Sequence, residues 1–293
     1  MIKPPPFNRN KKIGIVALAG PMESAKVLEG ERYLRALGYE VIIAPSCFER
    51  NRYLAGITDA DRALDLKMMF ADDEVGAIVN MRGGYGSNRI LPYLAGFEFA
   101  RYPKPFIGYS DITYMHIYLN QTHGLITYHG PMINDLLKND LLTTGSFIKT
   151  ALNAQPLTLK EIEFMNIGNR HSSGIIVGGN LSMICSTLGT RAEVDTRGKI
   201  IFMEEINEEP YSVDRLLMQL VHAGKIEECA GIILGDFSGT PQKEVFQTIE
   251  EILIPHGKVI AKNIPAGHTI PNISIPLGTH CELDTNKSEI RFC

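Results

Sequence analysis

The sequence of 293 residues contains no tryptophan, only five cysteines and no long hydrophobic run. The cysteines form no C-x-x-C pair and lack the spacing to histidine that zinc sites show, so we expect neither a metal nor a cofactor. We interpret them as reduced thiols that pack as small apolar side chains, and they are Cys47, Cys185, Cys229, Cys281 and Cys293.

No apolar stretch approaches the roughly 18 residues of a membrane-spanning helix. The run at residues 13–19 follows a basic amino terminus, but it is short and ends at Gly20-Pro21, so we interpret it as a first β-strand rather than a signal peptide. These patterns predict a cytoplasmic protein with no membrane partner.

An excess of basic charge is also missing. The chain has 29 Lys and Arg against 33 Asp and Glu, a net charge of −4, which gives no electrostatic reason to expect nucleic acid as a partner. At about 150 residues per domain, the length predicts about two domains. A chain of this size can bury roughly three quarters of its unfolded surface without disulfides or a structural metal.

Short β-branched runs alternate with helical periods in the first half, which is typical of βαβ units and a parallel sheet. The expected strands there are 13–18, 40–44, 76–80 and 105–108, with helices at 23–37 and 58–71. Later strands are expected at 174–177, 199–203, 231–234, 258–261, 273–275 and 288–292, with helices at 181–188 and 212–223. The fold class is therefore α/β, with an amino-terminal doubly wound parallel sheet and a smaller strand-rich carboxy-terminal domain.

The expected domains are residues 1–138, with Rossmann- or flavodoxin-like topology, and residues 171–293. The polar segment 139–170 between them is interpreted as a linker region with the end of a helix and the first strand of the second domain.

The segment Phe106 to Thr113 has the layout of a nucleophile elbow, because an apolar strand runs through Gly108-x-Ser110 directly into a helical pattern. Ser110 would then expose its hydroxyl at the sheet edge. The glycine that often follows such a serine by two residues is replaced by Ile112, and the residues alone leave open that Ser110 is a helix N-cap.

Two other strand ends carry functional candidates. RGGYG at 82–86 can form an anion-binding concavity, an oxyanion hole or a plain turn. Glu204, interpreted as the first residue after the strand at 199–203, could orient a histidine that activates a serine, or could cover a helix N-terminus. His268 and His129 both follow strands and compete as that histidine, whereas His116 is expected to pack or to lie on the surface.

Six motifs in order resemble the LD-carboxypeptidase family of serine peptidases over nearly the whole chain. They are RGGYG, GYSDIT, GGNLS, FMEEINEEPYSVDRLLMQL, LGDFSG, and GHT followed by PLG. The resemblance implies a catalytic triad of Ser110, Glu204 and His268 shared between the two domains. It also implies an oxyanion hole formed by the N–H groups of Gly84 and Asp111, and it suggests a homodimer.

The substrate implied by this resemblance is a murein tetrapeptide whose terminal D-alanine is released by cleavage of an L,D bond during peptidoglycan recycling. Arg82 could then bind a carboxylate or form an ion pair, and Tyr85 is a second candidate beside the glycine loop. Asn180 could line the site or cap a helix. Glu205, Glu208 and Glu209 could meet the ammonium group of a diamino acid or form a solvated face.

A close alternative is the microcin-immunity branch of the same fold, which cleaves acyl-sulfamoyl-adenylates. Adenine recognition favours an aromatic stacking platform, and the absence of tryptophan favours the muropeptide, although Tyr or Phe could substitute. An alternative of another class is a non-enzymatic two-domain protein that binds a metabolite. Such a protein would leave Ser110 unlabelled by a serine-directed covalent probe.

Overall fold

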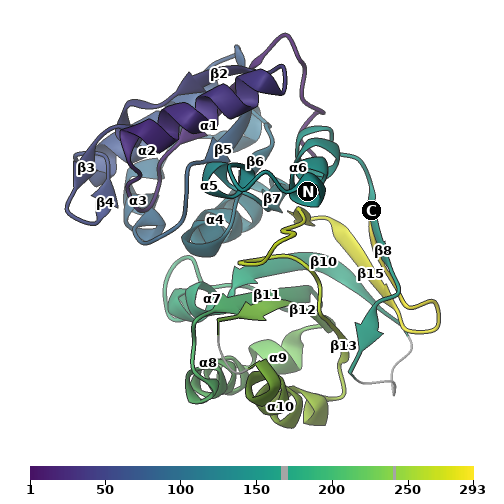
Figure 1. Ribbon diagram of the computed structural model, residues 1–293. Coiled ribbons are helices and arrows are strands. Elements are labelled where there is room, and N and C mark those ends of the chain that lie inside the picture. Colours follow the sequence, from purple (N-terminus) through teal and green to yellow (C-terminus); the bar gives the residue numbers. More distant parts are fainter. Residues whose placement is uncertain (166–170, 240–241) are drawn as a thin grey trace. The chain divides into compact units, whose positions relative to one another are not determined.

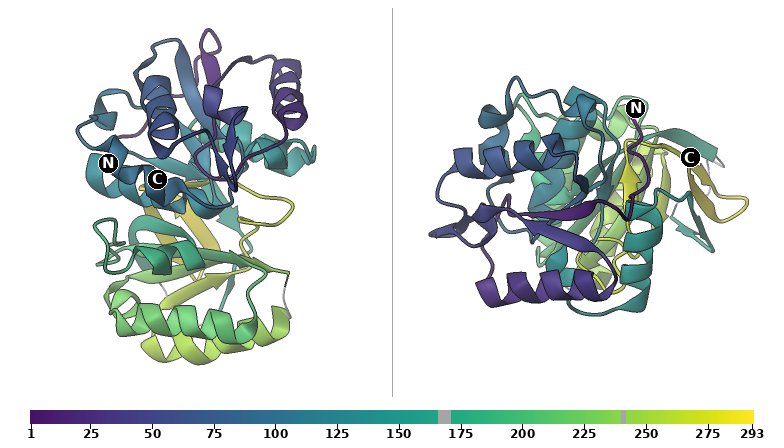
Figure 2. Two further views of the ribbon diagram at one scale, coloured as in Figure 1. Left: turned by 90° about the vertical axis from the view of Figure 1, so that its left-hand side faces the viewer. Right: turned by 90° about the horizontal axis from the view of Figure 1, so that it is seen from above.

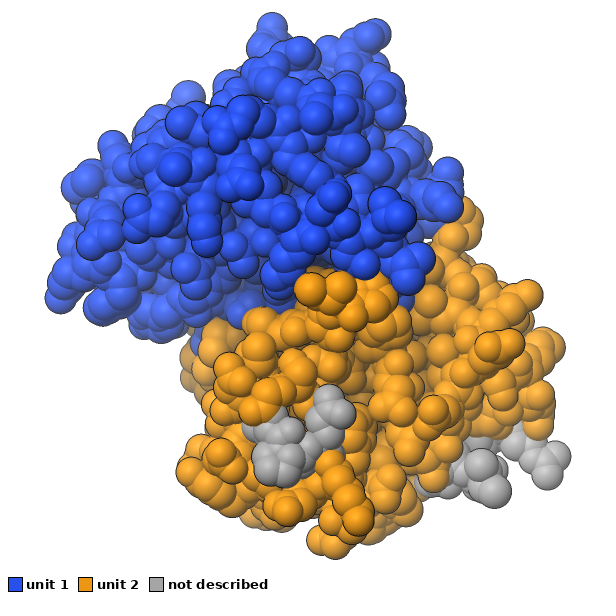
Figure 3. Space-filling model, viewed as in Figure 1, with its two compact units in different colours: residues 1–155, 273–275 blue, residues 156–272, 276–293 orange. Residues whose placement is uncertain are grey.

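The computed structural model describes residues 1–165, 171–239 and 242–293, and these residues form two compact units. Unit 1 comprises residues 1–155 and the short segment Ile273–Ile275, and unit 2 comprises residues 156–272 and 276–293 (Figure 3). Among the described residues, no helix is both long enough and apolar enough to cross a bilayer.

Unit 1 alternates strands and helices along the chain, as its sequence pattern predicts (Figure 1). Its strands are β1 (Lys12–Val16), β2 (Glu40–Ile43), β3 (Arg50–Asn51), β4 (Leu54–Ala55), β5 (Val75–Asn80), β6 (Phe106–Gly108) and β7 (Thr127–His129). Its α-helices are α1 (Ser24–Ala36), α2 (Asp59–Ala71), α3 (Ser87–Leu94), α4 (Thr113–His123), α5 (Ile133–Leu136) and α6 (Leu141–Ser146). Shorter helical segments are η1 (Pro45–Cys47), η2 (Phe99–Arg101), η3 (Ser110–Ile112) and the π-helix η4 (Phe147–Leu152).

The main sheet of unit 1 has the strand order β14-β7-β6-β5-β1-β2, and β14 (Ile275–Leu277) begins in the returning segment. The strands from β2 to β7 are parallel, which is the flavodoxin-like order with its switch point between β1 and β5. Ligands bind at such switch points, beyond the carboxyl ends of the strands. The loops that follow β1, β5 and β6 are therefore placed where a site is expected.

Local sequence signals explain why these elements form. Thr58 caps α2 through a capping box, because its hydroxyl accepts from the Asp61 N–H while the Asp61 carboxylate accepts from the Thr58 N–H. The central strands are buried on both faces, because the neighbours Ile15 and Val16 of β1 point to opposite faces and are both fully buried, as are Ile78 and Val79 of β5. This burial is the reason why those strands are continuous apolar runs in the sequence.

Unit 2 contains the remaining elements. Its strands are β8 (Leu157–Lys160), β9 (Glu163–Phe164), β10 (His171–Asn180), β11 (Ile200–Ile206), β12 (Gly231–Ser238), β13 (Val259–Lys262), β15 (His280–Asp284) and β16 (Glu289–Phe292). Its helices are α7 (Leu181–Thr187), α8 (Pro210–His222), α9 (Lys225–Glu228), α10 (Gln242–Leu253) and η5 (Ile254–His256).

The sheet of unit 2 is mixed, with the order β8-β16-β15-β10-β11-β12-β13-β9. Strands β10 to β13 are parallel, and antiparallel strands extend the sheet on either side. Helices α8 and α10 pack side by side on one face of this sheet (Figures 1 and 2). The expected α/β class, with a parallel amino-terminal sheet and a strand-rich second part, is confirmed.

Several element ends differ from the sequence-based ranges. The strand predicted to end at Met203 continues to Ile206, and β14 begins only at Ile275, where a strand over 273–275 was expected. The predicted linker 139–170 includes α6, η4, β8 and β9, and its residues 166–170 lie outside the described residues. The domain boundaries at 138 and 171 remain a prediction.

Candidate active site

Ser110 in unit 1 follows β6 at the carboxyl edge of the sheet and adopts a left-handed backbone conformation with φ of 64°. A non-glycine residue in this region is strained, and such strain is concentrated at functional sites. A side chain at Gly108 would place its Cβ 2.9 Å from Asn80 Nδ2 and 3.0 Å from Ile112 Cγ2. The tight strand-to-helix turn therefore needs a glycine two residues before the serine, as the sequence predicts.

The N-cap interpretation of Ser110 has no support in the hydrogen bonds of this turn. Segment η3 starts at Ser110 itself, and α4 starts at Thr113 with Ile112 in the N-cap position. Within the described part of the chain, neither start has a capping hydrogen bond from a side chain. The elbow therefore relies on contacts other than a side-chain cap.

The glycine loop after β5 packs directly on Ser110. A Cβ atom at Gly83 would lie 2.9 Å from both Cβ and Oγ of Ser110. The next residue, Gly84, has φ of 123° and would contact the Gly20 backbone at 3.1 Å with any side chain. The Gly20 N–H donates to the Gly83 carbonyl at 3.2 Å, so the loop after β1 supports the loop after β5. The oxyanion role of the Gly84 and Asp111 N–H groups remains a prediction.

The Asp111 side chain ties the elbow to α3. Its carboxylate accepts from the Ser87 N–H at 2.8 Å, and its carbonyl accepts from the Ser87 hydroxyl at 2.5 Å. Burial raises the pKa of this carboxyl, while the hydrogen bonds from Ser87 act in the opposite direction. Asp111 therefore fixes the position of its own main chain next to Ser110.

Two histidines of unit 1 lie in its interior. His116 Nε2 bonds the Gly108 carbonyl at 2.8 Å and its Nδ1 bonds Thr127 Oγ1 at 2.9 Å. Burial lowers the pKa of His116 to about 4, so the ring is neutral and supports the strand end that precedes Ser110. His129 is fully buried in β7, with its ring centroid 5.6 Å from that of Tyr109.

Unit 2 brings together the histidine and the glutamate that the sequence selected. His268 Nδ1 lies 2.7 Å from Glu204 Oε2, the Glu204 side chain is completely buried, and that of His268 is 16% exposed. Burial raises the pKa of Glu204, and the hydrogen bond from His268 opposes this shift. A buried carboxylate on Nδ1 fixes the ring's tautomer and leaves Nε2 as the reactive nitrogen.

The position of Glu204 within its strand corrects the sequence interpretation. Glu204 lies inside β11 and pairs with Asn180 of β10, whereas it was expected directly after the strand. The ladder between β11 and β12 is irregular here, because Met203 pairs with Leu234 and Glu205 with Phe237. This bulge places two residues of β12 opposite Glu204 alone, and bulges of this kind re-aim side chains next to active sites.

Sequence reasoning missed the residues that hold this pair. A Cβ atom at Gly267, which has φ of 120°, would lie 2.6 Å from Glu204 Oε2, and one at Gly235 would lie 3.0 Å from Glu204 Cβ. The Gly267 N–H donates to Asn272 Oδ1 at 3.0 Å, which closes the loop that carries His268. The glycine in GHT and the glycine in LGDFSG were the available signals.

Glu205 belongs to the framework of the strand end and not to a solvated face. Its side chain is buried and accepts from Asn180 Nδ2 at 2.9 Å, from the Ser182 N–H at 2.8 Å and from Ser182 Oγ at 2.6 Å. Asn180 also caps α7 by accepting from the Met183 N–H at 3.2 Å. Glu208 is partly exposed and Glu209 is exposed.

Arg82 and Tyr85 lie on the exposed side of the glycine loop. Arg82 Nε donates to the Gly83 carbonyl at 3.2 Å, and Arg82 has no ion pair among the described residues of unit 1. It lines a polar cavity of about 160 Å³ that also contains Lys26 and Arg50. Tyr85 is 45% exposed, and its ring centroid lies 6.0 Å from that of Tyr53.

The chain belongs to the LD-carboxypeptidase family of serine peptidases, and its α/β fold agrees with this membership. The family's amino-terminal domain matches residues 13–130, and its carboxy-terminal domain matches residues 173–283.

Particular relatives share most of the chain. A probable murein peptide carboxypeptidase of Bacillus subtilis is 37% identical over 97% of this chain and 92% of its own length. The solved muramoyltetrapeptide carboxypeptidase of Oxalobacter formigenes has a TM-score of 0.84 and 26% identity, covering 96% of this chain and 97% of its own. The solved complex of MccF with glutamyl sulfamoyl guanosine has a TM-score of 0.87 at 22% identity, and the match covers 99% of this chain and 97% of MccF. MccF therefore shares the fold of this chain.

Proposed function

We propose that this protein is a serine LD-carboxypeptidase that releases the terminal D-alanine from murein tetrapeptides. The buried Glu204–His268 pair in a member of this family carries the proposal, since a peptidase serine needs an oriented imidazole as its base. The names of the relatives from Bacillus subtilis and Oxalobacter formigenes support the substrate class.

In the proposed mechanism, His268 Nε2 takes the Ser110 hydroxyl proton while Ser110 Oγ attacks the carbonyl carbon of the L,D bond. Glu204 stabilises the imidazolium that forms, and the N–H groups of Gly84 and Asp111 stabilise the oxyanion. His268 then gives its proton to the leaving amine of D-alanine. Water, deprotonated by His268, hydrolyses the acyl-enzyme and restores Ser110.

The cavity beside the glycine loop gives Arg82 its proposed role. A murein tetrapeptide ends in a carboxylate. The lining of this cavity contains three basic residues, Lys26, Arg50 and Arg82, and one acidic residue, Glu23. We therefore propose that Arg82 binds a substrate carboxylate through its planar guanidinium. Tyr85 is proposed to contact the substrate, and Asn180 is proposed to line the substrate-binding site.

The decisive experiment offers the purified protein a free murein tetrapeptide with lysine or diaminopimelate at its third position, and measures D-alanine release by mass spectrometry. The Ser110→Ala variant is the control for contaminating peptidases. Release by the wild type and none by the variant is expected. No release from either tetrapeptide, or equal release by both proteins, would reject the proposal.

A parallel arm with an aminoacyl-sulfamoyl-adenosine tests the alternative activity. The exposed pair Tyr53 and Tyr85 offers an aromatic surface on which a base could stack, which is the observation that favours this second candidate. Faster cleavage of the sulfamoyl compound than of the tetrapeptides would assign the protein to that activity.

The remaining proposals concern the protein's surroundings and organisation. We propose a role in cytoplasmic peptidoglycan recycling, a homodimer and no nucleic-acid partner, with residues 1–138 and 171–293 as the two domains. Sedimentation equilibrium tests the homodimer, since a monomer mass at all concentrations would reject it.

A further inference from the structure

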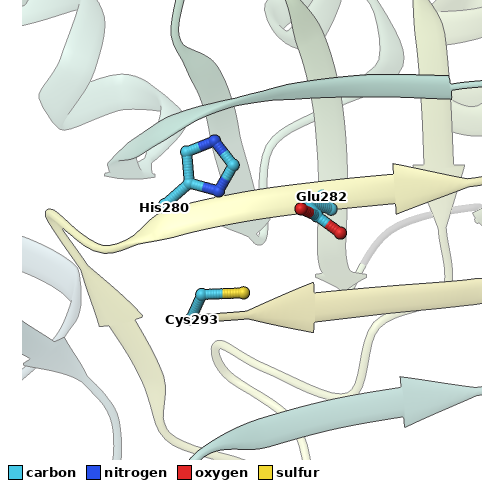
Figure 4. Close-up of side chains that lie close together, drawn as sticks. All are labelled: His280, Glu282 and Cys293. Atoms are coloured by element: carbon cyan, nitrogen blue, oxygen red, sulfur yellow. The ribbon is translucent and has the colours of Figure 1, made fainter.

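A histidine, a glutamate and a cysteine lie together on one face of the sheet of unit 2, away from the His268–Glu204 pair. His280 and Glu282 are two residues apart on β15, so their side chains point to the same face. The Cys293 N–H donates to the His280 carbonyl at 2.9 Å, which places Cys293 opposite His280 across the β15–β16 ladder. Figure 4 shows the three side chains beside one another on the neighbouring strands.

The donor atoms of these side chains are close enough to share one ion. One nitrogen of His280, one carboxylate oxygen of Glu282 and the sulfur of Cys293 all lie within 4.8 Å of one another. Tetrahedral zinc bonds of about 2.0–2.3 Å separate neighbouring ligand atoms by roughly 3.3–3.6 Å. Small side-chain rotations would therefore close the site without movement of the strands.

From this geometry we propose that His280, Glu282 and Cys293 bind Zn²⁺, with water in the fourth position. Imidazole nitrogen, thiolate sulfur and carboxylate oxygen are the donors that zinc uses in proteins. The nitrogen and sulfur donors disfavour the hard ions Mg²⁺ and Ca²⁺, which prefer oxygen ligands. On binding, the Cys293 thiol releases its proton to solvent and its sulfur forms the bond to zinc. The sequence spacing gave no such signal, since Cys293 lies eleven positions beyond Glu282 and meets it only through strand pairing.

A cation beside the cluster has a second carboxylate as its closer partner. Arg291, which pairs with Glu282 across the ladder, has its Nη2 3.8 Å from Glu282 Oε2, while its Nε makes a closer contact of 2.7 Å with Glu289 Oε1. Zinc would replace only the longer contact, and Arg291 would keep Glu289 as its partner. Across the other ladder, β10 places Ser173 opposite Glu282, where a hydroxyl group can bond a metal-bound water.

The exposure of Cys293 makes the proposal directly measurable. Of the five cysteines, Cys293 is exposed and the other four are buried. A thiol reagent added to the native, chelator-treated protein should therefore modify Cys293 rapidly and the other cysteines slowly. Bound zinc should slow this fast phase, because the coordinated thiolate is no longer available to the reagent.

The test measures the rate of Cys293 alkylation with and without Zn²⁺, and the visible absorption of the protein titrated with Co²⁺ as a spectroscopic substitute. We expect zinc to protect the thiol and cobalt to give a thiolate charge-transfer band that disappears when Cys293 is alkylated beforehand. These two readouts need no substitution. An unchanged alkylation rate at saturating zinc would overturn the proposal.

Variants then identify the ligands. His280→Ala and Glu282→Gln should each weaken zinc binding by more than the roughly 10- to 100-fold that loss of an outer-shell partner causes, and both should restore rapid alkylation in zinc. His222→Ala, which removes an exposed histidine of α8, is the matched control and should leave protection unchanged. Equal protection in all three variants would show that His280 and Glu282 do not hold the zinc that protects Cys293, and the proposed site would be rejected.

Discussion

The two units position their proposed catalytic side chains by different physical means. In unit 1, Ser110 is held by the backbone: its φ is 64°, and glycines at 83 and 108 let the neighbouring chain pack against it. In unit 2, His268 is held by a side chain, through a hydrogen bond of 2.7 Å to the fully buried Glu204. A nucleophile needs a fixed direction of attack, whereas a base needs a fixed tautomer, and the two forms of support match these needs.

The largest effect is expected from Ser110→Ala. Loss of the proposed nucleophile should lower kcat by on the order of 10⁶-fold, since the acyl-enzyme cannot form without this hydroxyl. The fold should remain intact because the hydroxyl makes no hydrogen bond that caps η3 or α4. D-alanine release and the thermal unfolding midpoint measure the two effects, and substantial residual activity would contradict the assigned nucleophile.

Glu204→Gln should have the next largest effect. The amide no longer stabilises the imidazolium and can hold the wrong tautomer of His268, so kcat should fall by on the order of 10⁴-fold. Glu205→Gln is the matched control, because the neighbouring carboxylate is also buried but bonds Asn180 and Ser182. The control should mainly lower the unfolding midpoint, and a larger kcat loss in Glu205→Gln than in Glu204→Gln would reverse the assignment.

His116 should make the stability of unit 1 depend on pH. Burial lowers its pKa to about 4 in the folded protein, against about 6.5 in the unfolded chain, so the unfolded state binds more protons between these values. Its contribution is complete above pH 6.5 and is lost as the pH falls toward 4, by up to about 3 kcal/mol. Urea unfolding across this range should show a smaller slope in His116→Gln; equal slopes would contradict the prediction.

Gly267→Ala tests whether the close contact between Gly267 and Glu204 positions His268 in unit 2. The new methyl group would lie 2.6 Å from Glu204 Oε2, and a displaced His268 should lower kcat by about 100-fold with little change in KM. Gly257→Ala is the control, since this glycine also has positive φ but its added Cβ meets nothing within 4 Å. Similar kcat losses in both variants would mean that backbone strain alone explains the effect.

The sequence predicted the features that depend on local order. The alternation of strands and helices and the strand-to-helix turn at Gly108-x-Ser110 both depend on neighbouring residues, and each is found in the structure. The pairing of Glu204 with His268 was proposed from motif resemblance, since 64 residues separate them.

Features that depend on strand pairing could not be predicted in this way. The bulge opposite Glu204 arises because β12 carries one residue more than β11, and no local pattern shows this mismatch. Burial of Glu205 contradicts the rule that acidic runs are solvated, because its hydrogen-bond partners come from the distant segment 180–182. The cluster of His280, Glu282 and Cys293 likewise exists only in the paired ladder.

The segment Ile273–Ile275 has a consequence for how this chain can be divided. It returns to unit 1 only five residues after His268, so the chain passes between the units three times, at 155/156, 272/273 and 275/276. A single cut therefore cannot yield two complete halves: a fragment ending at residue 155 lacks the segment whose Ser274 N–H bonds Ser146 Oγ at 2.8 Å. We therefore expect that split fragments, circular permutants and chimaeras of relatives fold correctly only when both units come from the same parent chain.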